Sequence, residues 1–132
     1  MREIKFRGKQ RRTGKWFYGN LYAKDIYGRT HICTTKCGCF DIDPETVGQF
    51  TGLMDKNGAE IYEGDIIGCH NPSIKHLIFY NEKQGRFMAA LNGDFENDFV
   101  GVCGLDDSRW IGSKKVIGNV YDNPELLKGG EK

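Results

Sequence analysis

The chain has almost no net charge, little proline and no long apolar run. Its 132 residues carry 19 Lys and Arg against 18 Asp and Glu, so its overall charge of +1 favours neither nucleic acid nor an anionic membrane. No window reaches the ~18 consecutive apolar residues of a membrane span, and no apolar stretch follows the basic start as in a secretory signal. We therefore expect a cytoplasmic protein whose five cysteines are reduced.

The residue types that are abundant, glycine and the aromatic residues, favour β-structure. Eighteen glycines and 12% aromatic residues, with only 3 prolines, are typical of many short strands joined by tight turns. Alternating or aromatic-rich runs predict strands at 3–7, 15–23, 30–34, 66–69, 76–80, 86–91 and 116–121, and a central hairpin at 47–67. Residues 36–39 fit either a loop or an irregular strand. So many short strands in one small chain indicate a closed or nearly closed barrel, or a sandwich.

Turn and helix-cap sequences separate the predicted strands. Asn57-Gly58 predicts a type I′ hairpin turn, since both of its central residues need positive φ. Gly64 and Asp65 predict a sharp corner, where Asp65 can accept backbone hydrogen bonds. Two Asx-Pro-Glu sequences, at 43–45 and 123–125, predict a single helical turn and a short C-terminal helix.

Three segments carry a family resemblance. They are MREIKFR at 1–7; VGQFTGL at 47–53 with DKNG at 55–58 and IYEGDII at 61–67; and VIGNVY at 116–121 with NPELL at 123–127. In this order they resemble the YopX family of phage and prophage proteins. The resemblance implies a small, mainly β protein with an SH3-like barrel element, additional β-hairpins and a short C-terminal helix. It supplies no catalytic residue.

The three segments lie at the two ends and in the middle of the chain, so we predict one YopX-like domain over residues 1–132. Residues 1–45 would form the N-terminal hairpin and a variable segment, residues 46–127 the barrel-like core, and residues 128–132 a tail.

A cluster of soft ligands raises a metal hypothesis. His31, Cys33, Cys37 and Cys39 lie within nine residues, and a tetrahedral zinc site needs four such ligands. The spacing C-x3-C-x-C is not that of a zinc knuckle, and ordinary reduced thiols explain it as well. We expect no cofactor.

Basic residues crowd the N-terminal hairpin. On a strand, Lys5 and Arg7 would share an outward face, opposite Ile4 and Phe6. Basic and aromatic side chains interleave here as in single-strand nucleic-acid sites, and the candidate residues are Lys5, Arg7, Arg11, Arg12, Lys15 and Trp16. Outward Lys and Arg also protect an exposed edge strand, which is the alternative explanation.

These observations lead to one prediction and two alternatives. We predict a non-enzymatic accessory protein, acting in the cytosol of a bacterial host, that binds a host or phage protein. The first alternative is a nucleic-acid-binding β-barrel that uses the basic hairpin. The second is a small metal- or cysteine-dependent enzyme. Exposed strand edges also allow a homo-oligomer, and no membrane association is expected.

Overall fold

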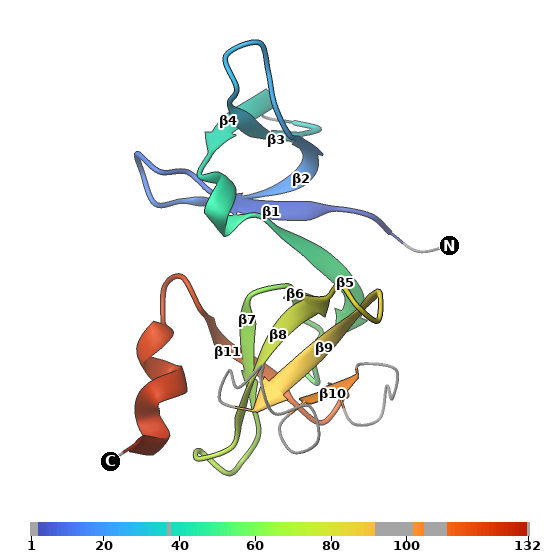
Figure 1. The fold of residues 1–132 in the computed structure, drawn as a ribbon, viewed down its shortest axis with the longest axis vertical. Coiled ribbons are helices and arrows are strands. Elements are labelled where there is room, and N and C mark those ends of the chain that lie inside the picture. The colour runs from blue at the N-terminus through green and yellow to red at the C-terminus, as the bar shows by residue number, and fades with distance from the viewer. Residues whose placement is uncertain (1–2, 37, 92–101, 105–110, 132) are drawn as a thin grey trace. The chain divides into compact units, whose positions relative to one another are not determined.

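The computed structural model describes residues 3–36, 38–91, 102–104 and 111–131 (Figure 1). They form two compact units, Met1–Gly52 and Leu53–Lys132, which we describe one at a time. The strands are β1 (Phe6–Lys9), β2 (Trp16–Tyr22), β3 (Thr30–Thr34), β4 (Gly38–Ile42), β5 (Gly48–Met54), β6 (Glu60–Tyr62), β7 (Asp65–Gly68), β8 (Lys75–Asn81), β9 (Arg86–Leu91), β10 (Val102–Gly104) and β11 (Lys115–Asn119).

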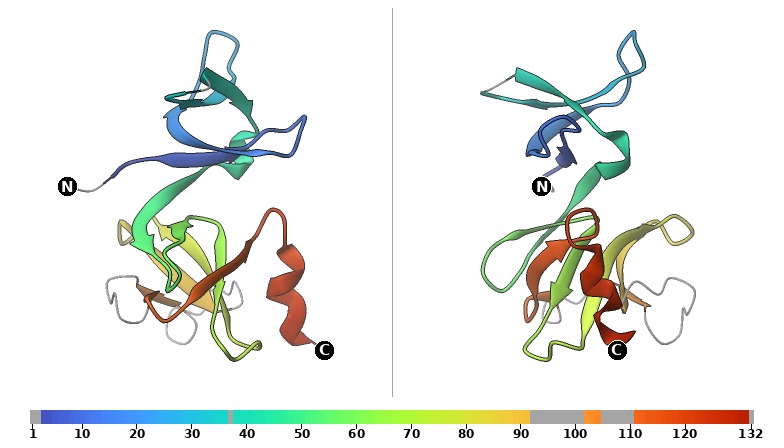
Figure 2. Two further views of the ribbon diagram at one scale, coloured as in Figure 1. Left: turned by 180° about the vertical axis from the view of Figure 1, so that it is seen from behind. Right: turned by 90° about the vertical axis from the view of Figure 1, so that its left-hand side faces the viewer.

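In the first unit, antiparallel strands run in the order β4-β3-β2-β1-β5. β2 curves from β1 to β3 (Figure 2): its first half pairs with β1 up to Phe6↔Gly19, and its second half pairs with β3 from Asn20↔Cys33. Gly19 lies at this change of partner, where a Cβ atom would clash with the Cys33 carbonyl oxygen. A residue without a side chain is therefore needed there.

The first unit also contains a short 3-10 helix, η1 (Pro44–Thr46), and a small apolar core. Asp43 caps η1 by accepting a hydrogen bond from the Glu45 amide, which confirms the single turn predicted there. Ile32 and Ile42 are almost fully buried. Phe17 of β2 stacks on Phe40 of β4 with ring centroids 3.9 Å apart.

The second unit contains a five-stranded antiparallel sheet in the order β10-β9-β8-β7-β11, together with β6, which pairs with the end of β5. Its core draws one apolar residue from each of several elements: Ile61, Ile67, Ile78, Ala89 and Ile111, with Leu53, Phe87 and Val116 packed against them. Burial of these side chains is the main force that holds the sheet together.

The predicted SH3-like barrel is not closed. In the described part of the second unit, the sheet ends at β10 and β11, which are not hydrogen-bonded neighbours. The mainly β fold class is confirmed, and the barrel is corrected to open antiparallel sheets, because the strands at either end of the order do not pair with each other.

The C-terminal helix is also corrected. Residues Pro124–Glu131 form a 3-10 helix, η2, in which the Leu126 amide donates to the Asn123 carbonyl three residues earlier. Gly129 and Gly130 follow within the same segment, and glycine favours an α-helix poorly.

The central hairpin turn differs from the predicted type I′ turn by one residue. The Gly58 amide donates to the Asp55 carbonyl and the Asp55 amide to the Ala59 carbonyl, so Lys56 and Asn57 are the central residues. Gly58 follows them with the positive φ expected of it, +83°. The reason for the shift is Asp55, whose Oδ1 accepts hydrogen bonds from the Asn57 and Ala59 amides, both at 2.8 Å.

The corner after β6 agrees with its prediction. Gly64 has φ +95°, and Asp65, only 1% exposed, accepts a 2.7 Å hydrogen bond from the Tyr62 amide through Oδ2. The Val120 amide donates to the Gly64 carbonyl, which attaches the chain after β11 to the corner.

Asp55 also reaches β11. Its Oδ2 accepts a 2.9 Å hydrogen bond from the Val116 amide, and the neighbouring Lys56 amide donates to the Lys114 carbonyl. Burial raises the pKa of Asp55, but the hydrogen bonds from the Val116, Ala59 and Asn57 amides outweigh it and leave that pKa below its ordinary value.

We expect Asp55→Ala to lower the free energy of unfolding by about 2–4 kcal/mol, because three amides lose their acceptor. Since the pKa of Asp55 is lower in the folded state, its contribution is complete at neutral pH and is lost as the pH falls below about 4. Urea unfolding at neutral pH and at a pH below about 4 measures the loss of stability in Asp55→Ala. The control is Glu82→Ala, in an exposed turn. Equal stability of both variants would show that Asp55 does not anchor the turn.

Candidate binding surface

β2 presents two tyrosines on one face. Side chains alternate along a strand, so Tyr18, Asn20 and Tyr22 point to one side and Phe17 and Leu21 to the other. Tyr18 is 48% exposed and Tyr22 56%, whereas Phe17 is half-buried against Phe40. We call Tyr18, Asn20 and Tyr22 the tyrosine face.

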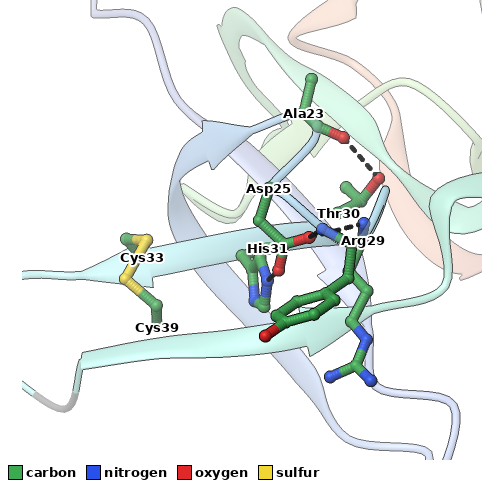
Figure 3. Close-up of polar contacts among 8 residues, drawn as sticks. Ala23, Asp25, Arg29, Thr30, His31, Cys33 and Cys39 are labelled. Carbon is green, nitrogen blue, oxygen red and sulfur yellow. Dashed lines mark hydrogen bonds and ion pairs between the residues drawn. A yellow bond between two sulfur atoms is a disulfide. The ribbon is translucent and has the colours of Figure 1, made fainter.

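The neighbouring hairpin of β3 and β4 extends this face. The register places Cys33 opposite Asn20 and His31 opposite Tyr22. On β4, Cys39 lies opposite Cys33, and the two form a disulfide (Figure 3). This corrects the expectation that all five cysteines are reduced. The physical reason is the register: directly opposed cysteines on antiparallel strands are close enough to be bridged.

The loop before β3 is organised by Asp25. Its Oδ1 accepts hydrogen bonds from the Tyr27 and Arg29 amides at 2.8 and 3.0 Å, and its Oδ2 lies 2.8 Å from His31 Nε2 (Figure 3). The hydrogen bond with His31, followed by that from the Arg29 amide, lowers the pKa of Asp25 to about 2. Thr30 adds a 2.8 Å hydrogen bond to the Ala23 carbonyl. Together these contacts fix the loop and the ring of His31.

An Asp–His pair can orient a general base, and a nucleophile beside it would suggest catalysis. The side chain two residues along β3 on the same face is Cys33, and its sulfur is bonded to Cys39. In this oxidation state the pair has no thiol at that position to activate.

The zinc hypothesis loses two of its four ligands in the same way. Cys33 and Cys39 are bonded to each other in the disulfide, and His31 Nε2 lies 2.8 Å from Asp25 Oδ2. Cys37 lies outside the described residues. Among those that the structure does describe, no three His, Cys, Asp or Glu side chains gather as a metal site.

The basic hairpin does not form the outward row of charges that its alternation predicted. Arg7 is only 5% exposed, with its guanidinium 4.8 Å from the centre of the Trp16 ring, while Ile4 is 63% exposed. The orientation of this strand was therefore predicted the wrong way round. Arg7 is tolerated inside because its planar guanidinium stacks on an aromatic ring.

Other predicted nucleic-acid residues have partners within the first unit. Arg11 Nη2 lies 3.1 Å from Asp43 Oδ1 and lowers the pKa of that carboxyl through this hydrogen bond. Lys5 Nζ lies 3.5 Å from Glu3 and 5.4 Å from the centre of the Phe50 ring. Arg12 and Lys15 are exposed near the turn between β1 and β2, whereas Arg7 is buried, so the six residues do not all lie on the surface.

Within the described ranges 3–36, 38–91, 102–104 and 111–131, no helix is long and apolar enough to cross a membrane. The two open antiparallel sheets define a small, mainly β protein.

The family model described as YopX protein matches residues 5–128, so the chain belongs to the YopX family, as its sequence motifs predicted. A solved structure, the crystal structure of protein EF1440 from Enterococcus faecalis, is similar to it with a TM-score of 0.59. The two sequences are 26% identical, and the match covers 96% of this chain and 99% of that one. No curated protein matches the chain.

The disulfide yields a prediction about stability. Reduction, or the double change Cys33→Ser with Cys39→Ser, should lower the free energy of unfolding by about 2 kcal/mol, because the short loop regains freedom in the unfolded chain. Thermal unfolding with and without dithiothreitol measures this. Cys69→Ser is the control, since Cys69 is a free thiol.

The reductant should shift the midpoint of the wild type and of Cys69→Ser, and leave that of the double variant unchanged. Alkylation of the unfolded, unreduced protein should label Cys69 and spare Cys33 and Cys39. Labelling of all three before reduction would contradict the disulfide.

Proposed function

We propose that this YopX-family chain is a non-enzymatic accessory protein, encoded by a phage or prophage, that binds a host or phage protein in the bacterial cytosol. The observation that carries the proposal is the exposed pair Tyr18 and Tyr22 on one face of β2. Tyrosine is enriched at protein interfaces, since it offers a large contact area and a hydroxyl while losing little conformational freedom.

The neighbours of the tyrosine face support a protein partner over nucleic acid. Two of the predicted phosphate-binding side chains are engaged internally, Arg7 on the Trp16 ring and Arg11 with Asp43. The face is further bordered by the carboxylate of Asp41, which lies opposite His31 and would repel phosphate.

In the cytosol, cellular thiols would hold Cys33 and Cys39 reduced, so binding is to be measured in both oxidation states.

We expect Tyr18→Ala with Tyr22→Ala to reduce partner capture about tenfold or more, as truncation of interface tyrosines commonly does. The measurement is a tagged pull-down from host cells, with and without nuclease, in oxidised and reduced buffer. Tyr80→Ala is the matched control, because Tyr80 is 41% exposed on β8 of the other unit. Thermal unfolding confirms that each variant is folded.

A stoichiometric protein that survives nuclease, is lost from the double variant and is kept by Tyr80→Ala would support the proposal. Recovery that collapses with nuclease would instead support the nucleic-acid alternative. That alternative requires affinity to fall steeply with salt and to weaken in Arg11→Ala with Arg12→Ala.

A further inference from the structure

A groove in the first unit overlaps the tyrosine face, because Tyr18 and Asn20 belong to its lining. It is lined by Glu3–Lys5, by Phe17–Asn20 of β2 and by Cys33–Lys36 at the end of β3. Its volume is about 480 Å³, within the roughly 300–1,000 Å³ that ligand sites occupy.

The groove follows from the change of partner along β2. The β1–β2 ladder stops at Phe6↔Gly19, so Glu3–Lys5 continue beyond it and form one wall. The β2–β3 ladder begins at Asn20↔Cys33, so residues 34–36 continue past it as the other wall. Two chain segments thus flank a floor of β2, an arrangement that suits an extended polypeptide lying between them.

The walls offer both apolar contact and charge. Ile4 is 63% exposed on one wall, and Phe17 lies half-buried in the lining. The lining contains two ammonium groups, those of Lys5 and Lys36, and one carboxylate, that of Glu3, which lies 3.5 Å from Lys5. The exposed Lys36 ammonium leaves the groove with an excess of positive charge.

The wall that carries Lys36 is attached to a cross-linked hairpin. Cys33 lines the groove and is bonded to Cys39, so the hairpin end from which residues 34–36 extend is held in one register. In the oxidised chain the wall is ordered before binding, which lowers the entropic cost of capturing a flexible segment. In the reduced chain the β3–β4 ladder, which pairs Thr34 with Gly38, holds the same end of the hairpin.

We propose that this groove binds an extended peptide segment of the partner protein, with an apolar side chain beside Ile4 and Phe17 and an acidic residue directed to Lys36. The proposal rests on the proposed function and specifies the kind of segment that such a partner presents. Apolar contact supplies affinity, and the acidic residue fixes the direction of the segment.

The test uses a randomised linear peptide library as the probe, selected on the full chain in both the oxidised and the reduced state. Enriched peptides should share an apolar residue near an Asp or Glu. A synthetic copy of the enriched peptide is then titrated against four variants, all in the first unit: Ile4→Ser and Lys36→Glu in the groove, and Ile26→Ser and Lys24→Glu outside it. Ile26 is 91% exposed and Lys24 is exposed, so they match the groove residues in chemistry.

Ile4→Ser should weaken binding about tenfold, because an apolar contact is lost. Lys36→Glu should weaken it about threefold to tenfold, and a peptide with Lys in place of its acidic residue should regain affinity for this variant. Ile26→Ser and Lys24→Glu should bind as the wild type does. No enriched peptide, enrichment of basic peptides, or equal affinity in all four variants would overturn the proposal.

The pull-down separates this proposal from the proposed function. A captured protein that is lost from Tyr22→Ala, a residue outside the groove lining, but retained by Ile4→Ser and Lys36→Glu would leave the function standing and overturn the groove. Peptide binding that depends on Ile4 and Lys36, with no captured protein, would support the groove and contradict the function.

Discussion

The hydrogen bonds of one carboxylate, Asp55, hold the second unit in its arrangement. Its side chain closes the turn between β5 and β6 and also accepts from Val116, 61 residues further along the chain. The core of this unit draws single residues from separate strands, such as Ile61 and Ile78, and burial of one face decides which side of each strand points inward. A buried acceptor with three defined donors adds directional hydrogen bonds that join the β5–β6 turn to β11.

In the first unit the main feature is that one strand, β2, pairs with two different strands in turn. β2 leaves β1 at Gly19 and joins β3 at Asn20. The exchange places the tyrosine face, the cross-linked hairpin and the groove next to one another, since all three border the same bend of β2. A binding surface thus arises from a feature of the backbone, and the side chains that occupy it complete its chemistry.

Particular residues show where sequence reasoning succeeded and where it failed. Gly64 and Asp65 were predicted in their roles because turn chemistry is local. Gly58 has the positive φ predicted for it, although it follows the central residues of the turn. Arg7 was placed on the wrong face, since alternation separates two faces of a strand without saying which is covered. The start of β4 was left open between a loop and an irregular strand, because its sequence, GCFDI, includes glycine and aspartate, which are depleted in strands. The disulfide was missed because composition indicated a reducing compartment, and only the register of β3 and β4 brings Cys33 opposite Cys39.

By itself, the sequence determined the family, the mainly β class and the positions of most strands and tight turns. These properties follow from residues that are neighbours along the chain, whose φ preferences and alternation act within a few positions. Only the tertiary structure decided that the sheets stay open, that Asp55 reaches Val116 and that Ile4 and Lys36 flank one groove. Each of these depends on segments that are distant in sequence and are brought together by strand pairing, which no local pattern encodes.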